Sequence, residues 1–459
     1  MRIFRKECSA VCKSVVWLLF VLLTIIFYFM NYGFDLMGNI RQAETGKDFD
    51  FSFPSEKIHV FYASYTTENN PLAPPDENRE TFGYENLIVP DMTMANAAAT
   101  LTGEYLVERG DYFFAGYGDF GQYLYERLGY MRYTKLGFLK YELLSDSERN
   151  EIAAIIKDMT GLTPEEVYER VRDIGVSGSF AVRSDFDATG KIPIVISYED
   201  FLVKMKTVDD IIGGGSGYAE DKLESFASRP ITYEEKLQEY KYLMDQDGIG
   251  NAYARYYCDY MGIVVALFGA FIPVTYLMRD RRGGLAQTIM AKRISSSRLI
   301  LSRYFASAAM MILPIILLSV LPATQLAVFG SARGIETQPL AFLPHVALWL
   351  LPTVFVVTGV GFLFALLTDT PIAILIQGVW SYATLIATPM TGSGGIRGAG
   401  LLLRFNEVGG GEIVREAFAS IFLNRVAYMV LSAALVSLCV LIYHHKRRGQ
   451  IDLRGRFKR

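Results

Sequence analysis

Long apolar stretches are the feature that most limits what this chain can fold into. One lies at residues 15–34 and five more lie between residues 260 and 443, beyond a long polar segment. A helix needs about 20 apolar residues to cross a bilayer. Lipid offers the main chain no hydrogen bonds, so such segments cross as helices. We therefore predict an α-helical polytopic membrane protein with six transmembrane helices, at residues 15–34, 259–278, 301–329, 340–367, 372–390 and 425–443.

Charge is segregated along the chain. Residues 35–258 hold 22 Lys and Arg against 39 Asp and Glu, and the rest of the chain holds 23 against 9. Loops rich in Lys and Arg lie on the cytoplasmic side of a membrane. The pattern therefore predicts cytoplasmic termini, a cytoplasmic loop at 279–298 and an extracellular segment at 35–258. The clustered basic residues are Arg2, Arg5, Lys6, Lys13, Arg279, Arg281, Arg282, Lys292, Arg293, Arg298, Lys446, Arg447, Arg448, Arg454, Arg456, Lys458 and Arg459.

The two ends of this topology depend on short segments. Only Thr368, Asp369, Thr370 and Pro371 separate the fourth and fifth spans, and a turn there keeps the basic tail at 444–459 in the cytoplasm. No small-residue cleavage site follows the first span, so we predict an uncleaved anchor in the plasma membrane after a cytoplasmic segment at 1–14.

Cysteine usage points to the compartment. The four cysteines leave residues 35–258 with Cys258 alone, at the outer face, and so without an internal disulfide. This mildly favours a bacterial plasma membrane. Cys8 and Cys12 have no His or further Cys nearby, so we interpret them as small residues on a helix rather than metal ligands.

The segment at 35–258 is long enough to bury a core of its own. Ser145, Thr163 and Thr232 each stand three residues before a Glu, which is the pattern of a capping box at a helix start. Strand-like sequences occur at 58–62 and 192–196. We predict an extracellular α+β domain between the first and second transmembrane helices.

Two sequences in this domain allow a sharper interpretation. Tyr and Phe crowd residues 112–141, where they could line a ligand surface, lie at the lipid headgroup level or pack in the core; core packing is favoured. Residues 165–170 match the EExxxR string of a class of intramembrane peptidases. That chemistry needs carboxylates inside a membrane helix, so we predict a solvated helix face instead.

Catalytic and nucleotide-binding motifs are missing from the sequence. It contains no GxxxxGK[ST] phosphate loop, no HExxH and no GxSxG. We therefore predict no enzyme activity, no bound cofactor or metal and no nucleic-acid partner. The glycine-rich segment at 392–400 is predicted to be a mobile or re-entrant outer loop.

Ionisable residues within a membrane are functional candidates by default. The candidates within the predicted spans are His345, Asp369 and Gln377. His345 and Asp369 lie near span ends, close to water, and Gln377 could hydrogen-bond a neighbouring helix. Because a row of buried charges is missing, we expect another subunit to supply energy.

The loop at 279–298 has more pattern than retention of basic residues requires. Glycines and serines bound a short predicted helix, Leu285 and Ile289 give it an apolar face, and basic residues stand at both ends. A loop that only fixes topology is the plain alternative.

At this point the chain resembles the permease subunits of type-2 ABC exporters. Those proteins have six spans, often a large outer domain between the first two, and a charged, glycine-containing cytoplasmic segment between the second and third. The resemblance implies a homodimer or heterodimer driven by a separate ATP-binding cassette ATPase, which docks on the N-terminal segment and on the cytoplasmic loop. The loop residues expected to make this contact are Asp280, Arg281, Arg282, Leu285, Ile289, Lys292 and Arg293.

The leading interpretation is thus an exporter permease with an unidentified substrate, amphiphilic or peptide in nature. The other class that stays open is a sensor or scaffold for an extracellular ligand without transport activity. Such a protein normally carries a cytoplasmic signalling domain, whereas here the inner parts are tails and short loops.

Overall fold

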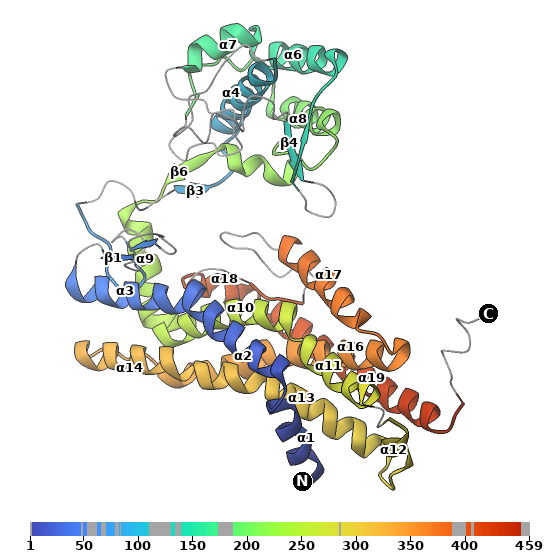
Figure 1. Ribbon diagram of the computed structural model, residues 1–459. Coiled ribbons are helices and arrows are strands. Elements are labelled where there is room, and N and C mark those ends of the chain that lie inside the picture. The colour runs from blue at the N-terminus through green and yellow to red at the C-terminus, as the bar shows by residue number, and fades with distance from the viewer. Residues whose placement is uncertain are drawn as a thin grey trace. The chain divides into compact units, whose positions relative to one another are not determined.

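The computed structural model describes residues 2–46, 49–52, 62–65, 70–78, 82, 84–109, 130–133, 139–172, 187–283, 286–387, 401–404 and 408–450. The described part is mostly helical (Figure 1). It divides into two compact units. The helical unit comprises Met1–Pro75 and Leu237–Arg459, and the inserted unit comprises Asp76–Lys236.

Five helical stretches are long and apolar enough to cross a membrane, judged by length and composition: Val15–Thr45, Ile249–Arg279, Ser296–Arg333, Pro339–Thr368 and Phe418–Arg447. Each overlaps one of the six predicted spans. The remaining predicted span, at 372–390, corresponds to the shorter apolar helix Ile372–Leu385. The membrane assignment is therefore confirmed for a multi-pass helical protein.

The spans are built from successive helical segments. The first combines α2 (Val15–Tyr28), the π-helical turn η1 (Phe29–Gly33) and α3 (Phe34–Thr45). The second combines α10 (Ile249–Phe268) with α11 (Phe271–Arg282), and the third combines α13 (Ser296–Leu318) with α14 (Val320–Arg333). The fourth is the run of η6 (Pro339–Ala341), α15 (Phe342–His345), η7 (Val346–Leu350) and α16 (Leu351–Thr368). The shorter apolar helix is α17 (Ile372–Ala387), and the short helix α18 (Gly411–Glu416) precedes the last span, α19 (Phe418–Arg447).

Local sequence explains where these helices begin and end. The Ser14 hydroxyl accepts from the Trp17 amide at 3.1 Å and starts α2. Ser295 does the same for α13. The predicted turn between the fourth and fifth spans is confirmed, since Asp369 adopts φ 59° and ends α16. That left-handed conformation is tolerated by Asp better than by most residues.

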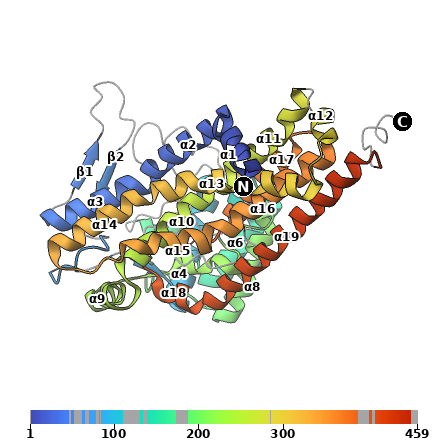
Figure 2. The same cartoon turned by 90° about the horizontal axis from the view of Figure 1, so that it is seen from below.

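Buried aromatic and aliphatic side chains hold the helical unit together. Tyr32 and Tyr257 are fully buried between the first span and α10, and the Tyr257 hydroxyl donates to the Ile315 carbonyl at 2.6 Å. Helix α16 packs against α11, α13, α17 and α19, and α19 runs along it (Figure 2). The predicted hydrogen bond from Gln377 to another helix is confirmed, with 3.3 Å from its Nε2 to the Ala266 carbonyl.

The inserted unit has its own core around α4 (Pro90–Arg109), which packs against α6 (Asp146–Thr160), α7 (Pro164–Val171) and α8 (Tyr198–Ile212) (Figure 1). Its further elements are η4 (Glu220–Phe226), the pair β3 (Tyr84–Asn86) and β6 (Ser228–Pro230), the pair β4 (Tyr130–Tyr133) and β5 (Leu139–Glu142), and the start of α9 (Tyr233–Tyr242). Both pairs are antiparallel.

Several sequence predictions for the inserted segment can be scored. The capping boxes at Ser145 and Thr163 are confirmed, with reciprocal bonds to Glu148 and Glu166. The EExxxR string lies on the exposed face of α7, as predicted. Most of the aromatic-rich stretch at 112–141 lies outside the described residues.

The strand prediction at 192–196 is wrong. Ile192 makes only an isolated bridge to Thr189, and the segment is otherwise irregular. Pro193 has no N–H to donate, and the Val195 amide donates to the Met159 carbonyl at the end of α6. Of the predicted strand at 58–62 only Tyr62 is described. It begins β2 (Tyr62–Tyr65), which pairs with β1 (Phe49–Ser52) in the helical unit.

Candidate functional site

The predicted cytoplasmic loop contains a short helix, α12 (Ala286–Ala291), between α11 and α13. Asp280, Arg281 and Arg282, three of the seven residues predicted to contact an ATPase, are the last residues of α11. Leu285 lies outside the described residues. The helix predicted in this loop is confirmed by α12.

The other three predicted contact residues divide between two faces. Ile289 is half-buried and, with Met290, packs against a cluster that includes Ile300. Lys292 and Arg293 follow α12 and are exposed. The apolar side of α12 thus faces its own chain, and the basic residues after it face outward.

The end of α19 contacts this loop. Arg447 donates through Nη1 to the Ile294 carbonyl and through Nη2 to the Lys292 carbonyl. Both carbonyls lie in the short connection between α12 and the Ser295 cap of α13. One guanidinium therefore binds two main-chain acceptors of the loop, which its planar fork of donors allows.

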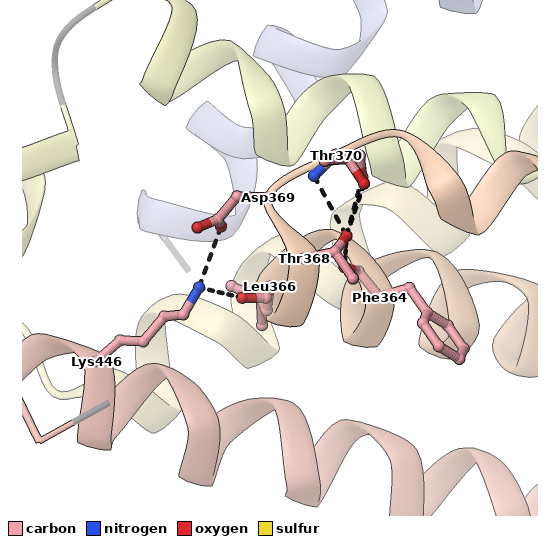
Figure 3. A network of polar contacts seen from close by, with 6 residues as sticks. All are labelled: Phe364, Leu366, Thr368, Asp369, Thr370 and Lys446. Carbon is pink, nitrogen blue, oxygen red and sulfur yellow. Dashed lines mark hydrogen bonds and ion pairs between the residues drawn. The ribbon is translucent and has the colours of Figure 1, made fainter. Parts of the chain in front are cut away.

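Lys446, the residue before Arg447, contacts the end of α16 and the turn that follows it. The Lys446 ammonium lies 3.1 Å from Asp369 Oδ1 and also donates to the Leu366 carbonyl (Figure 3). The side chains of Lys446 and Asp369 are 8% and 11% exposed. The last carbonyls of a helix lack partners within it, and Lys446 donates to one of them, that of Leu366. Its positive charge is also stabilised by the negative C-terminal end of the α16 dipole.

The N-terminal helix α1 (Arg2–Cys12) joins the same end of the unit. It packs along α13. The Glu7 carboxylate accepts from the Tyr276 hydroxyl and lies 3.7 Å from Arg303 Nε. Cys8 and Cys12 are half-buried on this helix and pack against the core, as predicted. The three basic segments of the sequence thus meet at one end of the helical unit.

Charged groups far from this end were missed from the sequence. Asp259, Arg404 and Arg425 are at most 8% exposed, and Arg255 forms a bidentate pair with Asp247 at 2.6 and 2.5 Å. These buried charges add to His345, Asp369 and Gln377, the polar groups weighed from the sequence. The signal was available, because Asp259 and Arg425 interrupt or border apolar runs.

Among the described residues of the inserted unit, Glu104 is the buried acid. Glu104 of α4 is 9% exposed, and its Oε2 accepts from the Tyr218 hydroxyl at 2.6 Å. Burial raises the pKa of the Glu104 carboxyl to about 7. Burial, and then the charge of Glu104, hold the pKa of the Tyr218 hydroxyl well above its usual range. Within the described residues, His, Cys, Asp and Glu form no group that could hold a metal ion.

Comparison with known proteins adds one finding. The family described as "ABC-2 family transporter protein" matches residues 153–405. The matched region begins in α6 and includes α12 and α16. No curated protein and no solved structure matches the chain.

Proposed function

The chain belongs to the ABC-2 transporter family, whose match covers more than half of its 459 residues, and from that premise we propose that it is the permease subunit of an ATP-binding cassette exporter. ATP would be hydrolysed by a separate subunit, since the sequence has no phosphate loop. The permease would pair with a second copy or a related chain. An amphiphilic molecule or a peptide is the proposed class of substrate.

One observation carries this proposal. The N-terminal helix and the end of α19 both contact α13 or the α12 loop before it: Glu7 lies 3.7 Å from Arg303 of α13, and Arg447 binds the Ile294 carbonyl of the loop. All three segments are rich in Lys and Arg, and such segments lie on the cytoplasmic side of a membrane. Both termini and the loop would then be cytoplasmic, within reach of a soluble ATPase, and residues 35–258 would be extracellular.

The contact with the ATPase is proposed to use the outward side of the loop. Lys292 and Arg293 are exposed there and would set docking register and association rate more than affinity. Arg281, Arg282 and Asp280 at the end of α11 would add to this charged rim. Leu285 would complete the docked surface, and Ile289 would pass the motion of α12 to the helices behind it.

Co-purification tests the ATPase partner. The tagged full chain, expressed with the genes that surround its own, is expected to retain a subunit with a Walker-type phosphate loop and to hydrolyse ATP. The double variant Lys292→Glu/Arg293→Glu should lose that subunit, whereas Arg415→Glu, a change at an exposed arginine of α18, should keep it. Equal retention by both variants would contradict the proposed docking surface.

Surface labelling tests the orientation. Single cysteines at the exposed positions Thr189, Thr288 and Gln450 are treated with a membrane-impermeant thiol reagent in intact cells. Thr189→Cys should be labelled, and the other two should react only after the membrane is opened. Labelling of Gln450→Cys from outside would give an odd number of spans and overturn the six-span topology.

A further inference from the structure

Two consecutive residues at the end of α19 bind two different segments, the α16–α17 turn and the α12 loop. We propose that Lys446 and Arg447, named here the α19 clamp, are positioning residues that make α12 and the α16–α17 turn move as one body. This inference rests on the proposed function, because it concerns how motion of α12 reaches the spans. It is distinct from the docking surface, which faces outward.

The Lys446 arm holds the turn between α16 and α17. Its ammonium binds Asp369 at 3.1 Å together with the Leu366 carbonyl (Figure 3). Asp369 is also the residue whose left-handed φ of 59° reverses the chain. A largely buried ion pair is costly to break, since removing one partner leaves the other charge poorly solvated. The turn is therefore tied to α19 where its backbone changes direction.

The Arg447 arm holds the loop. The carbonyls of Lys292 and Ile294 belong to the residues between α12 and α13, and one guanidinium binds both. Neighbouring residues on a helix point about 100° apart. Lys446 and Arg447 can therefore reach two different segments from adjacent sides of α19 while sharing one rigid backbone.

Apolar packing between α12 and the spans is incomplete, although Ile289 and Met290 contact the cluster that includes Ile300. A pocket lies between this helix and the bundle, with Ile289 on the α12 side and Ile300, Leu366 and Lys446 on the other. Side chains that line such a pocket lose van der Waals contacts with the atoms across it. The clamp therefore adds polar contacts from α19 to both the α12 loop and the α16–α17 turn.

Variants can remove each arm separately. Arg447→Gln should free the loop, and Lys446→Gln should free the turn. Arg448→Gln is the matched control, because Arg448 is the next residue, carries the same charge and is exposed. Thermal unfolding of each purified complex identifies variants that fail to fold.

The readout is a distance between spin labels at Thr288→Cys on α12 and Leu375→Cys on α17, in a chain with Cys8 and Cys12 changed to Ala. Both labelled positions are exposed. The complex with its ATPase is measured without nucleotide and with a non-hydrolysable ATP analogue. In the parent chain and in Arg448→Gln the distance should stay the same.

Arg447→Gln and Lys446→Gln should instead show a nucleotide-dependent shift of about 3 Å or more, within the range of known helix shifts. Their rate of ATP hydrolysis should remain within about twofold of the parent rate, because the docking surface is intact. A variant distance that stays constant, or a parent distance that shifts equally, would overturn the clamp. A parent chain that binds no ATPase would instead overturn the proposed function.

Discussion

Arg425 of α19 donates through Nη1 to the main-chain carbonyl of Trp349, 2.9 Å away in the π-helical turn η7. The same nitrogen lies 3.0 Å from the Thr353 hydroxyl. Pro352 follows the turn and has no N–H to offer a carbonyl of the preceding turn. Wide π-helical turns likewise disturb the regular ladder of hydrogen bonds. A side chain from a distant helix therefore donates to a carbonyl of the irregular turn that precedes Pro352.

The relationship between Arg425 and Trp349 predicts a large cost for removing the guanidinium. Arg425→Leu should lower the free energy of unfolding by about 1–3 kcal/mol for each buried acceptor that it leaves without a partner. Thermal unfolding of the purified full chain in detergent measures the loss. The matched control is Arg415→Leu, since Arg415 has an exposed side chain whose contacts are with Glu412 at 3.6 Å and the Tyr242 ring at 5.8 Å. Equal destabilisation by both changes would refute the role given to Arg425.

Most of the helical fold could be predicted from the hydrophobic pattern and from the helix caps. The apolar runs located the spans, because a membrane helix is specified by local composition. Ser145, Thr163 and Thr232 located helix starts, since a cap acts over three residues. The same pattern failed at 192–196, where β-branched residues suggested a strand. Strand formation needs a partner that local sequence cannot supply.

The candidate site was predictable in part. Charge segregation identified the loop and both tails, because the positive-inside rule acts on short segments. The contacts of Lys446 with Asp369 and of Arg447 with Ile294 join residues 77 and 153 positions apart. No local pattern reports such pairs. The inward packing of Ile289 was missed for the same reason, since an amphipathic helix shows an apolar face but not what covers it.

Gly250 near the start of α10 should not tolerate a side chain. A Cβ atom there would collide with the carbonyl oxygens of Thr337 and Gln338. These are main-chain atoms, so relief requires a shift of the segment before η6. Gly250→Ala is therefore expected to lower the melting temperature of the full chain by several degrees.

The control for this change is another glycine within a helix. A Cβ atom at Gly378 of α17 would meet no atom within 4 Å. Gly378→Ala should leave the melting temperature unchanged or raise it slightly, because alanine restricts the unfolded chain. A fall of the same size for both variants would show that the close approach at Gly250 does not limit stability.

The inserted unit, Asp76–Lys236, should fold by itself. It has its own buried cluster around α4 and three complete capping boxes, at Ser145, Thr163 and Thr232. None of the four cysteines falls within it. Expressed alone, it is expected to unfold in one cooperative thermal transition that a reducing agent does not change. A broad transition with exposed apolar surface would show that the unit needs the rest of the chain to complete its core.

The buried Glu104 carboxyl should make the stability of this unit fall as the pH rises. The pKa of Glu104 is raised from 4.5 to about 7 in the folded state by burial. Between these values the folded state keeps a proton that the unfolded state has released. The free energy of unfolding should therefore decrease from pH 4.5 to pH 7, by an amount on the order of 3 kcal/mol, and change little above it through this group.

Other carboxyl groups act in the opposite direction. Bonds from Ser145 lower the pKa of Glu148, so its contribution grows as the pH rises from below its unfolded pKa. The comparison must therefore be made against Glu104→Gln, whose amide oxygen can still accept from the Tyr218 hydroxyl. Thermal unfolding of the isolated unit at intervals from pH 4.5 to 8 gives both curves. The difference between the parent and the variant should shift in favour of the variant across this range. A difference that is the same at every pH would mean that Glu104 is already ionised in the folded unit at pH 5, and that its burial does not hold the proton.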